Sequence, residues 1–284
     1  MARRAGASVR SRRLAYVLRK LRVASGLSCV EFGQAIGMSS SKISRVETCD
    51  SGIYIDDVEK MLDFYEIGGI RKMEILDLAR HAEQRGWLRM QGPELPDDWQ
   101  TWVDFESEAT ALSSYQPLTI PGQLQTAEYA RAIIQATGSG LSDDQLDALV
   151  ISRLSRQGLL SRSRPLILRT VVEEGVLTRP IGDNSVLARQ LNHLADAAAR
   201  PNVTVRVLPT DAGLHSGLNG PFVIMDYDEE PSLVLLENKV ASLFLDEEEQ
   251  IETYFASWDE LVMLSHDDDA SIEVIRAAAK RVAG

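Results

Sequence analysis

The strongest constraint on the fold is the spacing of apolar residues near the N-terminus. Leu14, Val17, Leu18 and Leu21 recur at intervals of three and four residues, which places them on one face of a helix. Gly26 follows at a position where a glycine commonly ends a helix. We therefore predict a helix over residues 11–24 that buries one apolar stripe.

Two further short helices are predicted from their start and stop signals. Ser28 and Glu31 have the spacing of a capping box, so a second helix should begin there and continue to about residue 36. Gly37 tolerates the positive φ that a turn requires, and Ser39 can cap a third helix that ends near residue 48. Gly33 is small where the two helices should approach most closely, and the inward apolar positions are Phe32, Ile36, Met38, Ile43 and Val46.

The outward face of the third helix is polar and basic. Its side chains are Ser40, Ser41, Lys42, Ser44 and Arg45. A helix that enters the major groove of DNA needs such a face, because the base edges offer hydrogen-bond donors and acceptors. The pattern therefore predicts a helix-turn-helix.

Charge separates the chain into two parts. Residues 1–50 hold ten basic and three acidic residues, whereas the remainder holds 20 basic and 39 acidic residues. A basic segment can neutralise phosphates, whereas the acidic remainder would be repelled by DNA. The first five arginines are Arg3, Arg4, Arg10, Arg12 and Arg13. They allow two interpretations. The segment could be an arm that lies in a minor groove or along the DNA backbone, or it could be a disordered tail.

The segment LSCVEFGQAIGMSSSKISRVE resembles the phage-repressor-like (xenobiotic-response-element) helix-turn-helix family, and the likeness covers about residues 11–80. It implies that Arg22 and Glu47 form a structural salt bridge. It also implies that bases are read by Ser40, Ser41 and Arg45, and that phosphates are contacted by Ser39, Lys42 and Ser44. The family usually has glutamine at the start of the second helix, and this sequence has Cys29.

The remainder of the chain mixes helices and strands. We predict two more helices, over residues 55–65 and 70–87, that complete a five-helix domain, and a Pro- and Gly-rich linker. Beyond it we expect helices over 98–112, 127–136, 142–160, 184–199, 247–264 and 270–282, and strands over 166–172, 203–208, 222–227 and 233–236. The predicted fold class is mixed: an all-α helix-turn-helix domain (1–88), a linker (89–98) and an α+β regulatory domain (99–284).

The second half also resembles a known family. The segments TIPGQLQTAEYARAII, ISRLSRQGLL, RPIGDNSVLARQLNHL, NVTVRVLP and GPFVIMDY are similar to the C-terminal domain of unknown function (DUF5753-like) of actinobacterial regulators. The resemblance implies an antitoxin-like transcriptional regulator, encoded in many cases beside a small partner protein. No ligand residues follow from it.

Other chemistries find little support in the sequence. None of the four histidines stands at metal-ligand spacing with a cysteine or another histidine, and no nucleophile elbow or phosphate-binding loop is present. We expect no catalytic residues, no metal and no cofactor. Cys29 and Cys49 could form a redox switch or be two unrelated thiols. We find neither a signal peptide nor an apolar run long enough to span a membrane, and we expect a cytoplasmic protein.

These features predict a sequence-specific DNA-binding transcriptional regulator that acts on double-stranded DNA as a homodimer at a palindromic site, with the second domain sensing a ligand or a small partner protein. Two alternatives remain open. The protein could serve mainly as an antitoxin-like module that binds a small neighbour-encoded protein. Its C-terminal domain could also be an enzyme that acts on a small molecule.

Overall fold

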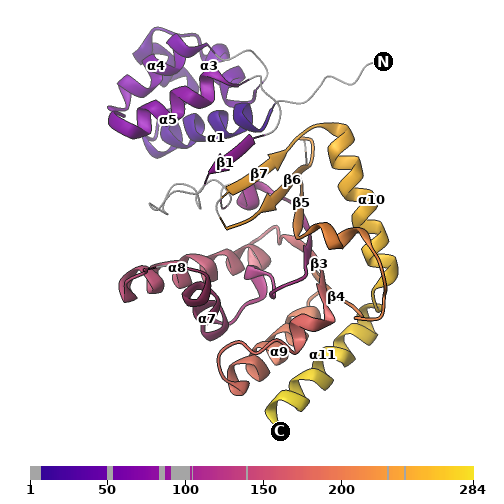
Figure 1. The fold of residues 1–284 in the computed structure, drawn as a ribbon. Helices are drawn as coiled ribbons and strands as arrows, with labels where there is room; N and C mark the ends of the chain where they lie inside the picture. The colour runs from indigo at the N-terminus through magenta and orange to yellow at the C-terminus, as the bar shows by residue number, and fades with distance from the viewer. Residues whose placement is uncertain are drawn as a thin grey trace. The chain divides into compact units, whose positions relative to one another are not determined.

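The computed structural model describes residues 8–49, 54–82, 87–90, 103, 105–138, 140–228, 230–239 and 241–284. The chain divides into two compact units. The first comprises residues 1–101 and 240–247, and the second comprises residues 102–239 and 248–284. The predicted class, a helical N-terminal domain followed by a domain of mixed strands and helices, is confirmed (Figure 1). Most of the predicted linker, residues 91–98, lies outside the described residues.

The first unit contains the five predicted helices. They are α1 (Val9–Ala24), α2 (Cys29–Ile36), α3 (Ser40–Glu47), α4 (Ile55–Phe64) and α5 (Gly69–Arg80). Their buried face is formed by side chains that are at most 2% exposed: Leu14, Leu18, Phe32, Ile43, Val46, Val58, Met61 and Leu62. The Phe32 ring stacks on Tyr65 with 5.0 Å between centroids, which joins α2 to the end of α4.

The local signals of the helix-turn-helix act as the sequence predicts. Ser28 and Glu31 form the reciprocal capping box at the start of α2. Gly37 ends that helix in the left-handed conformation, with φ of 69°. Gly33 lies against the turn, because a Cβ added to it would stand 2.5 Å from the Met38 carbonyl oxygen. The α2–α3 crossing therefore requires glycine at this position.

A pair of strands accompanies the helices in the first unit. Strand β1 (Trp87–Met90) runs antiparallel to β7 (Ala241–Leu245), with Trp87 opposite Phe244 and Met90 opposite Ala241. The prediction that the fifth helix continues to Trp87 is wrong, since α5 ends at Arg80. The sequence after α5 forms a strand because a partner strand arrives from a distant part of the chain, and a local pattern does not reveal that partner.

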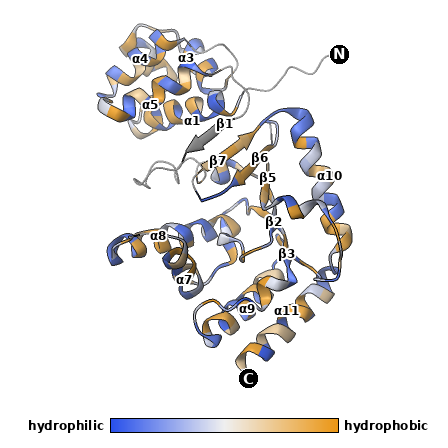
Figure 2. Ribbon diagram, viewed as in Figure 1, coloured by the Kyte–Doolittle hydropathy of each residue, from blue (hydrophilic) through white to orange (hydrophobic). Residues whose placement is uncertain are grey.

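The second unit is built on a mixed sheet with strands in the order β6-β5-β2-β3-β4. The strands are β2 (Ala111–Gln116), β3 (Ile167–Glu173), β4 (Val203–Leu208), β5 (Phe222–Asp226) and β6 (Leu233–Glu237). Strands β2, β3 and β4 are parallel, whereas β5 runs antiparallel to β2 and β6 antiparallel to β5. Strands β5 and β6 are largely apolar (Figure 2).

Helices connect the parallel strands and pack on the sheet. Between β2 and β3 lie α7 (Ala127–Thr137) and α8 (Asp143–Ser155), and α9 (Asn184–Ala198) connects β3 to β4. The last two helices are α10 (Glu248–Leu264) and α11 (Asp268–Ala283). Helix α11 packs against α9 and β4, whereas α10 packs against β4, β5 and β6. Such crossover connections are the usual way to join parallel strands.

One predicted helix of the second unit is wrong in part. Residues 105–108 are helical, but the proposed helix over 98–112 stops short of Ala111, where β2 begins. Residues 111–115 are buried on both faces, so the side chains of this central strand do not alternate between apolar and polar. A doubly buried strand lacks the period of two that identifies a half-exposed strand in a sequence.

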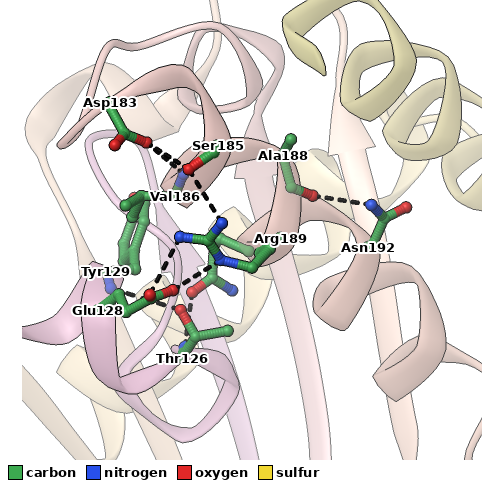
Figure 3. Close-up of polar contacts among 10 residues, drawn as sticks. Thr126, Glu128, Tyr129, Asp183, Ser185, Val186, Ala188, Arg189 and Asn192 are labelled. Atoms are coloured by element: carbon green, nitrogen blue, oxygen red, sulfur yellow. Dashed lines mark hydrogen bonds and ion pairs between the residues drawn. The ribbon is translucent and has the colours of Figure 1, made fainter.

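Polar side chains hold α7 to α9 (Figure 3). Arg189 donates to both carboxylate oxygens of Glu128, at 2.8 and 3.0 Å, across an exposed surface. Beneath it the fully buried Gln190 accepts from the Thr126 backbone N–H at 2.6 Å and donates to the Leu124 carbonyl at 2.7 Å. Gln190 therefore fixes the segment that leads into α7.

A second polar link is completely buried. Arg156 donates to both oxygens of Glu106, at 2.5 and 3.0 Å, and these side chains are 4% and 0% exposed. Gln123 also donates to Glu106. Burial and the neighbouring Arg156 lower the pKa of Arg153 to about 10. The buried charges of Arg156 and Glu106 therefore depend on each other for compensation.

Replacing Gly33 by alanine should lower the free energy of unfolding by about 1–3 kcal/mol, because the added methyl group collides with the Met38 carbonyl. Urea unfolding of the whole chain, followed by circular dichroism, measures the change. Gly68→Ala is the matched control, since a Cβ at Gly68 meets no atom within 4 Å. Equal stability of the two variants would contradict a tight crossing.

The carboxylates of Glu106 and Glu128, which each bind an arginine, should differ sharply in their contribution to the free energy of unfolding. Glu106→Ala leaves Arg156 buried without its carboxylate and should cost about 3–5 kcal/mol. Glu128→Ala removes an ion pair whose side chains are about half exposed and should cost at most about 1 kcal/mol. Calorimetric unfolding of both variants compares the losses, and similar values would refute the assigned difference.

Candidate nucleic-acid interface

The N-terminus of α3 is built from serine side chains. Ser39 has extended backbone angles, and its hydroxyl accepts from the Lys42 backbone N–H at 3.3 Å. The Ser39 and Ser41 hydroxyls lie 3.2 Å apart. The first turn of a helix carries N–H groups without partners in the helix and the positive end of its dipole, so this end suits an anionic phosphate.

The polar residues of α3 differ in accessibility. Ser39, Ser41, Ser44 and Arg45 are exposed, and Ser40 is half-buried. Ile43 and Val46 are buried on the opposite side of the helix. The expected division into an apolar inner face and a polar outer face is therefore present, and the structure brings the serines and Arg45 together on one short helix.

Lys42 has a different environment from its neighbours. Its ammonium group lies 2.6 Å from a carboxylate oxygen of Asp57, a residue that is only 7% exposed, and 5.9 Å from the centre of the Tyr54 ring. The pair joins α3 to the first turn of α4. Sequence reasoning assigned Lys42 to phosphate contact and missed Asp57, although an acidic residue in a first helical turn is a recognisable signal.

The Arg22–Glu47 salt bridge, implied by the family resemblance, is present. Arg22 Nε and Nη2 donate to the two oxygens of Glu47, each at 2.7 Å, and Nη1 donates to the Leu27 carbonyl at 2.8 Å. The hydrogen bond to Glu47 raises the pKa of Arg22. The planar guanidinium therefore joins the end of α1, the α1–α2 turn and the end of α3.

The basic residues near the N-terminus do not behave as one arm. Arg10, Arg12 and Arg13 belong to α1, and Arg12 is only 5% exposed, so neither interpretation as an arm or a tail fits these three. The Arg13 guanidinium and the Lys20 ammonium lie 5.7 and 5.5 Å from the centre of the Tyr16 ring. Arg3 and Arg4 lie outside the described residues.

Another polar cluster of the second unit lies at the carboxyl ends of its parallel strands. Tyr115, the penultimate residue of β2, donates to Glu173 Oε1 at 2.6 Å, and His215 Nε2 lies 3.5 Å from the same oxygen. The His215 side chain is 5% exposed, and its Nδ1 has no hydrogen-bond partner among the described residues. Burial and the Glu173 hydrogen bond raise the pKa of Tyr115.

This cluster occupies the part of a sheet where α/β proteins commonly bind ligands. His215 lies in the loop after β4, and Gly217 packs against the Tyr115 ring so tightly that an added Cβ would stand 2.5 Å from it. The neighbouring Ser216 donates its backbone N–H to Glu260 of α10 at 3.1 Å. Hydrogen bonds from the Ser216 side chain and from its backbone lower the pKa of Glu260. Sequence reasoning gave His215 no role, because its partners come from other strands.

Other chemistry is limited in the part of the chain that the structure describes. The described residues contain no group of three or more histidine, cysteine or acidic side chains arranged to hold a metal ion. Cys29 and Cys49 are both free thiols. Among the helices formed by these residues, none has the length and apolar character needed to cross a membrane.

Comparison with known proteins adds two matches to family models. A helix-turn-helix domain matches residues 13–71, and the domain of unknown function DUF5753 matches residues 99–277. No curated protein matches the chain.

Among solved structures, one similar chain is TrmBL2, described as an archaeal chromatin protein that shows a novel mode of DNA binding. It is 13% identical, and the alignment covers 75% of this chain and 65% of that one, less than two thirds of its length, with a TM-score of 0.29. So low a score supports no argument about fold or function. The DUF5753 match covers more than half of the sequence. This chain therefore belongs to the DUF5753 family and carries a helix-turn-helix domain ahead of the family's domain.

Proposed function

We propose that this protein is a sequence-specific DNA-binding transcriptional regulator of the cytoplasm. The observation that carries the proposal is the presentation of α3, whose exposed face holds Ser41, Ser44 and Arg45 while its ends are fixed by the Ser39 cap and the Arg22–Glu47 bridge. Rigid support of a short polar helix is what reading of base edges requires.

Within this proposal the residues of α3 divide by role. Ser40, Ser41 and Arg45 read bases, with the Arg45 guanidinium suited to the two acceptors of a guanine edge. Ser39 and Ser44 contact phosphate. The ion pair between the Lys42 ammonium and the Asp57 carboxylate favours a role for Lys42 in holding α3 to α4. Lys42 contacts phosphate as well only if its ammonium reaches DNA without leaving Asp57.

The second unit supplies the input to the regulator, as either a ligand or a small partner protein. The polar cluster of Tyr115, Glu173 and His215 favours a sensing role, because it stands at the carboxyl ends of parallel strands and includes a buried imidazole nitrogen without a partner among the described residues. An antitoxin-like function, in which a small protein binds this unit and DNA binding is the output, is compatible with the same arrangement. The proposal assigns the chain no catalytic reaction, metal or cofactor.

Arg45→Ala should abolish or blur the DNA sequence preference, with a loss of roughly 1–3 kcal/mol of discrimination at one base pair. The test recovers bound fragments from genomic DNA at about 150 mM salt, an ionic strength at which nonspecific contacts are weakened. Arg71→Ala, which removes an exposed arginine from α5, is the matched control. A motif shared by wild type and both variants would exclude Arg45 from base reading.

We also expect the protein to bind DNA as a homodimer, because one helix-turn-helix covers few base pairs and two half-sites increase affinity and specificity. The recovered motif should then be a palindrome whose half-sites lie about one helical turn, roughly 34 Å, apart. Sedimentation of the protein–DNA complex measures its stoichiometry. A complex of one chain with one undivided site would rule the dimer out.

A further inference from the structure

A short segment of the C-terminal half belongs structurally to the DNA-binding unit. Residues 240–247 are part of the first unit, although the residues before and after them form the second. They include β7, which pairs with all four residues of β1, from Ala241 opposite Met90 to Phe244 opposite Trp87. Ala241, Phe244 and Leu245 are buried. The segment is therefore an integral part of the first unit.

The end of this segment contacts the first helix. Asp246 Oδ2 accepts a hydrogen bond from the Val9 backbone N–H at 2.8 Å, and both residues are buried. Val9 is the first residue of α1, whose neighbouring Ser8 hydroxyl accepts from Ser11 N instead. Asp246 and Ser8 thus accept hydrogen bonds from two different backbone N–H groups in the first turn of α1. A carboxylate is favoured there because the helix dipole is positive at this end.

Helix α1 extends from this contact to the Arg22–Glu47 bridge at the end of α3. Its first residue is bound by Asp246, and Arg22, near its last residue, forms the bidentate pair with Glu47 at the end of α3. Its 16 residues span about 24 Å as one helix. A displacement of Asp246 therefore acts on the element that fixes the end of α3.

Both ends of the segment are anchored in the second unit. Strand β6 ends three residues before it, and α10 begins at the residue after it. Helix α10 buries Ile251, Trp258 and Leu261, and its Glu260 accepts from Ser216 in the loop that also carries His215. A change in the second unit that moves α10 thus pulls on Asp246 through one residue of chain, Glu247.

We propose that residues 240–247 couple the two units, with Asp246 as a positioning residue that holds α1 and, through α1, the presentation of α3. The inference rests on the proposed DNA-binding function for its biological meaning. Coupling free energies are reciprocal, so DNA bound to α3 must also change the stability of α10. This reciprocity allows a test without knowledge of the natural ligand.

The experiment is hydrogen–deuterium exchange of the full-length chain, read by mass spectrometry, with and without the DNA fragment recovered by the wild type. The variants are Asp246→Ala, Asp246→Asn, which keeps an acceptor oxygen, and the matched control Glu247→Gln, which alters the exposed neighbouring carboxylate. Without DNA, Asp246→Ala should speed exchange of the first turn of α1 about five- to tenfold, the usual effect of losing a helix cap. Asp246→Asn should restore most of the protection, and Glu247→Gln should change nothing.

With DNA, wild type and Glu247→Gln should show altered exchange in α10, and Asp246→Ala should lose that change. A merely structural role for Asp246 predicts no effect of DNA on α10 in any variant, and that outcome overturns the coupling. Unchanged α1 protection in Asp246→Ala, measured without DNA, overturns the positioning role by itself. Absence of DNA binding by the wild type would refute the proposed function, whereas the DNA-free comparison would still decide whether Asp246 positions α1.

Discussion

The position of helix α3 depends on one guanidinium group. Arg22 makes hydrogen bonds to Glu47 and to the Leu27 carbonyl, so three separate pieces of backbone share a single planar donor. An α3 of eight residues is too short to be stable alone, and its geometry has to come from tertiary contacts. The buried Ile43 and Val46 fix how closely α3 packs on the core of the first unit. The Ser39 cap fixes the start of α3, and the Arg22–Glu47 salt bridge fixes its end.

Features of the first unit that depend on neighbouring residues were predictable from the sequence. The Ser28–Glu31 capping box, the left-handed Gly37 and the Ser39 cap each arise within three or four residues, where a pattern carries enough information. The Arg22–Glu47 pair was available only through the resemblance to a family. Contacts such as Lys42–Asp57 join different helices, and no local rule specifies which acidic residue a lysine will meet.

The second unit shows the same limit more strongly. Its half-exposed or strongly apolar strands, such as β4, were predicted closely. The doubly buried β2 was not predicted as a strand, and the helix expected over 98–112 covered its first two residues. The Tyr115–Glu173–His215 cluster assembles residues from β2, the end of β3 and the loop after β4. A sequence contains each of these residues separately, and only the parallel pairing of the strands places them beside one another.

The return of residues 240–247 to the first unit affects how the protein is made. A nascent chain emerges from the ribosome with α1 first, yet the carboxylate that binds Val9 lies 237 residues later. Until residue 246 has been synthesised, the first unit lacks Asp246 and the complete strand β7. Such a long-range contact closes late because a large loop must be ordered first. Completion of the first unit therefore requires synthesis through Asp246, and a product terminated before that residue lacks this part of the unit.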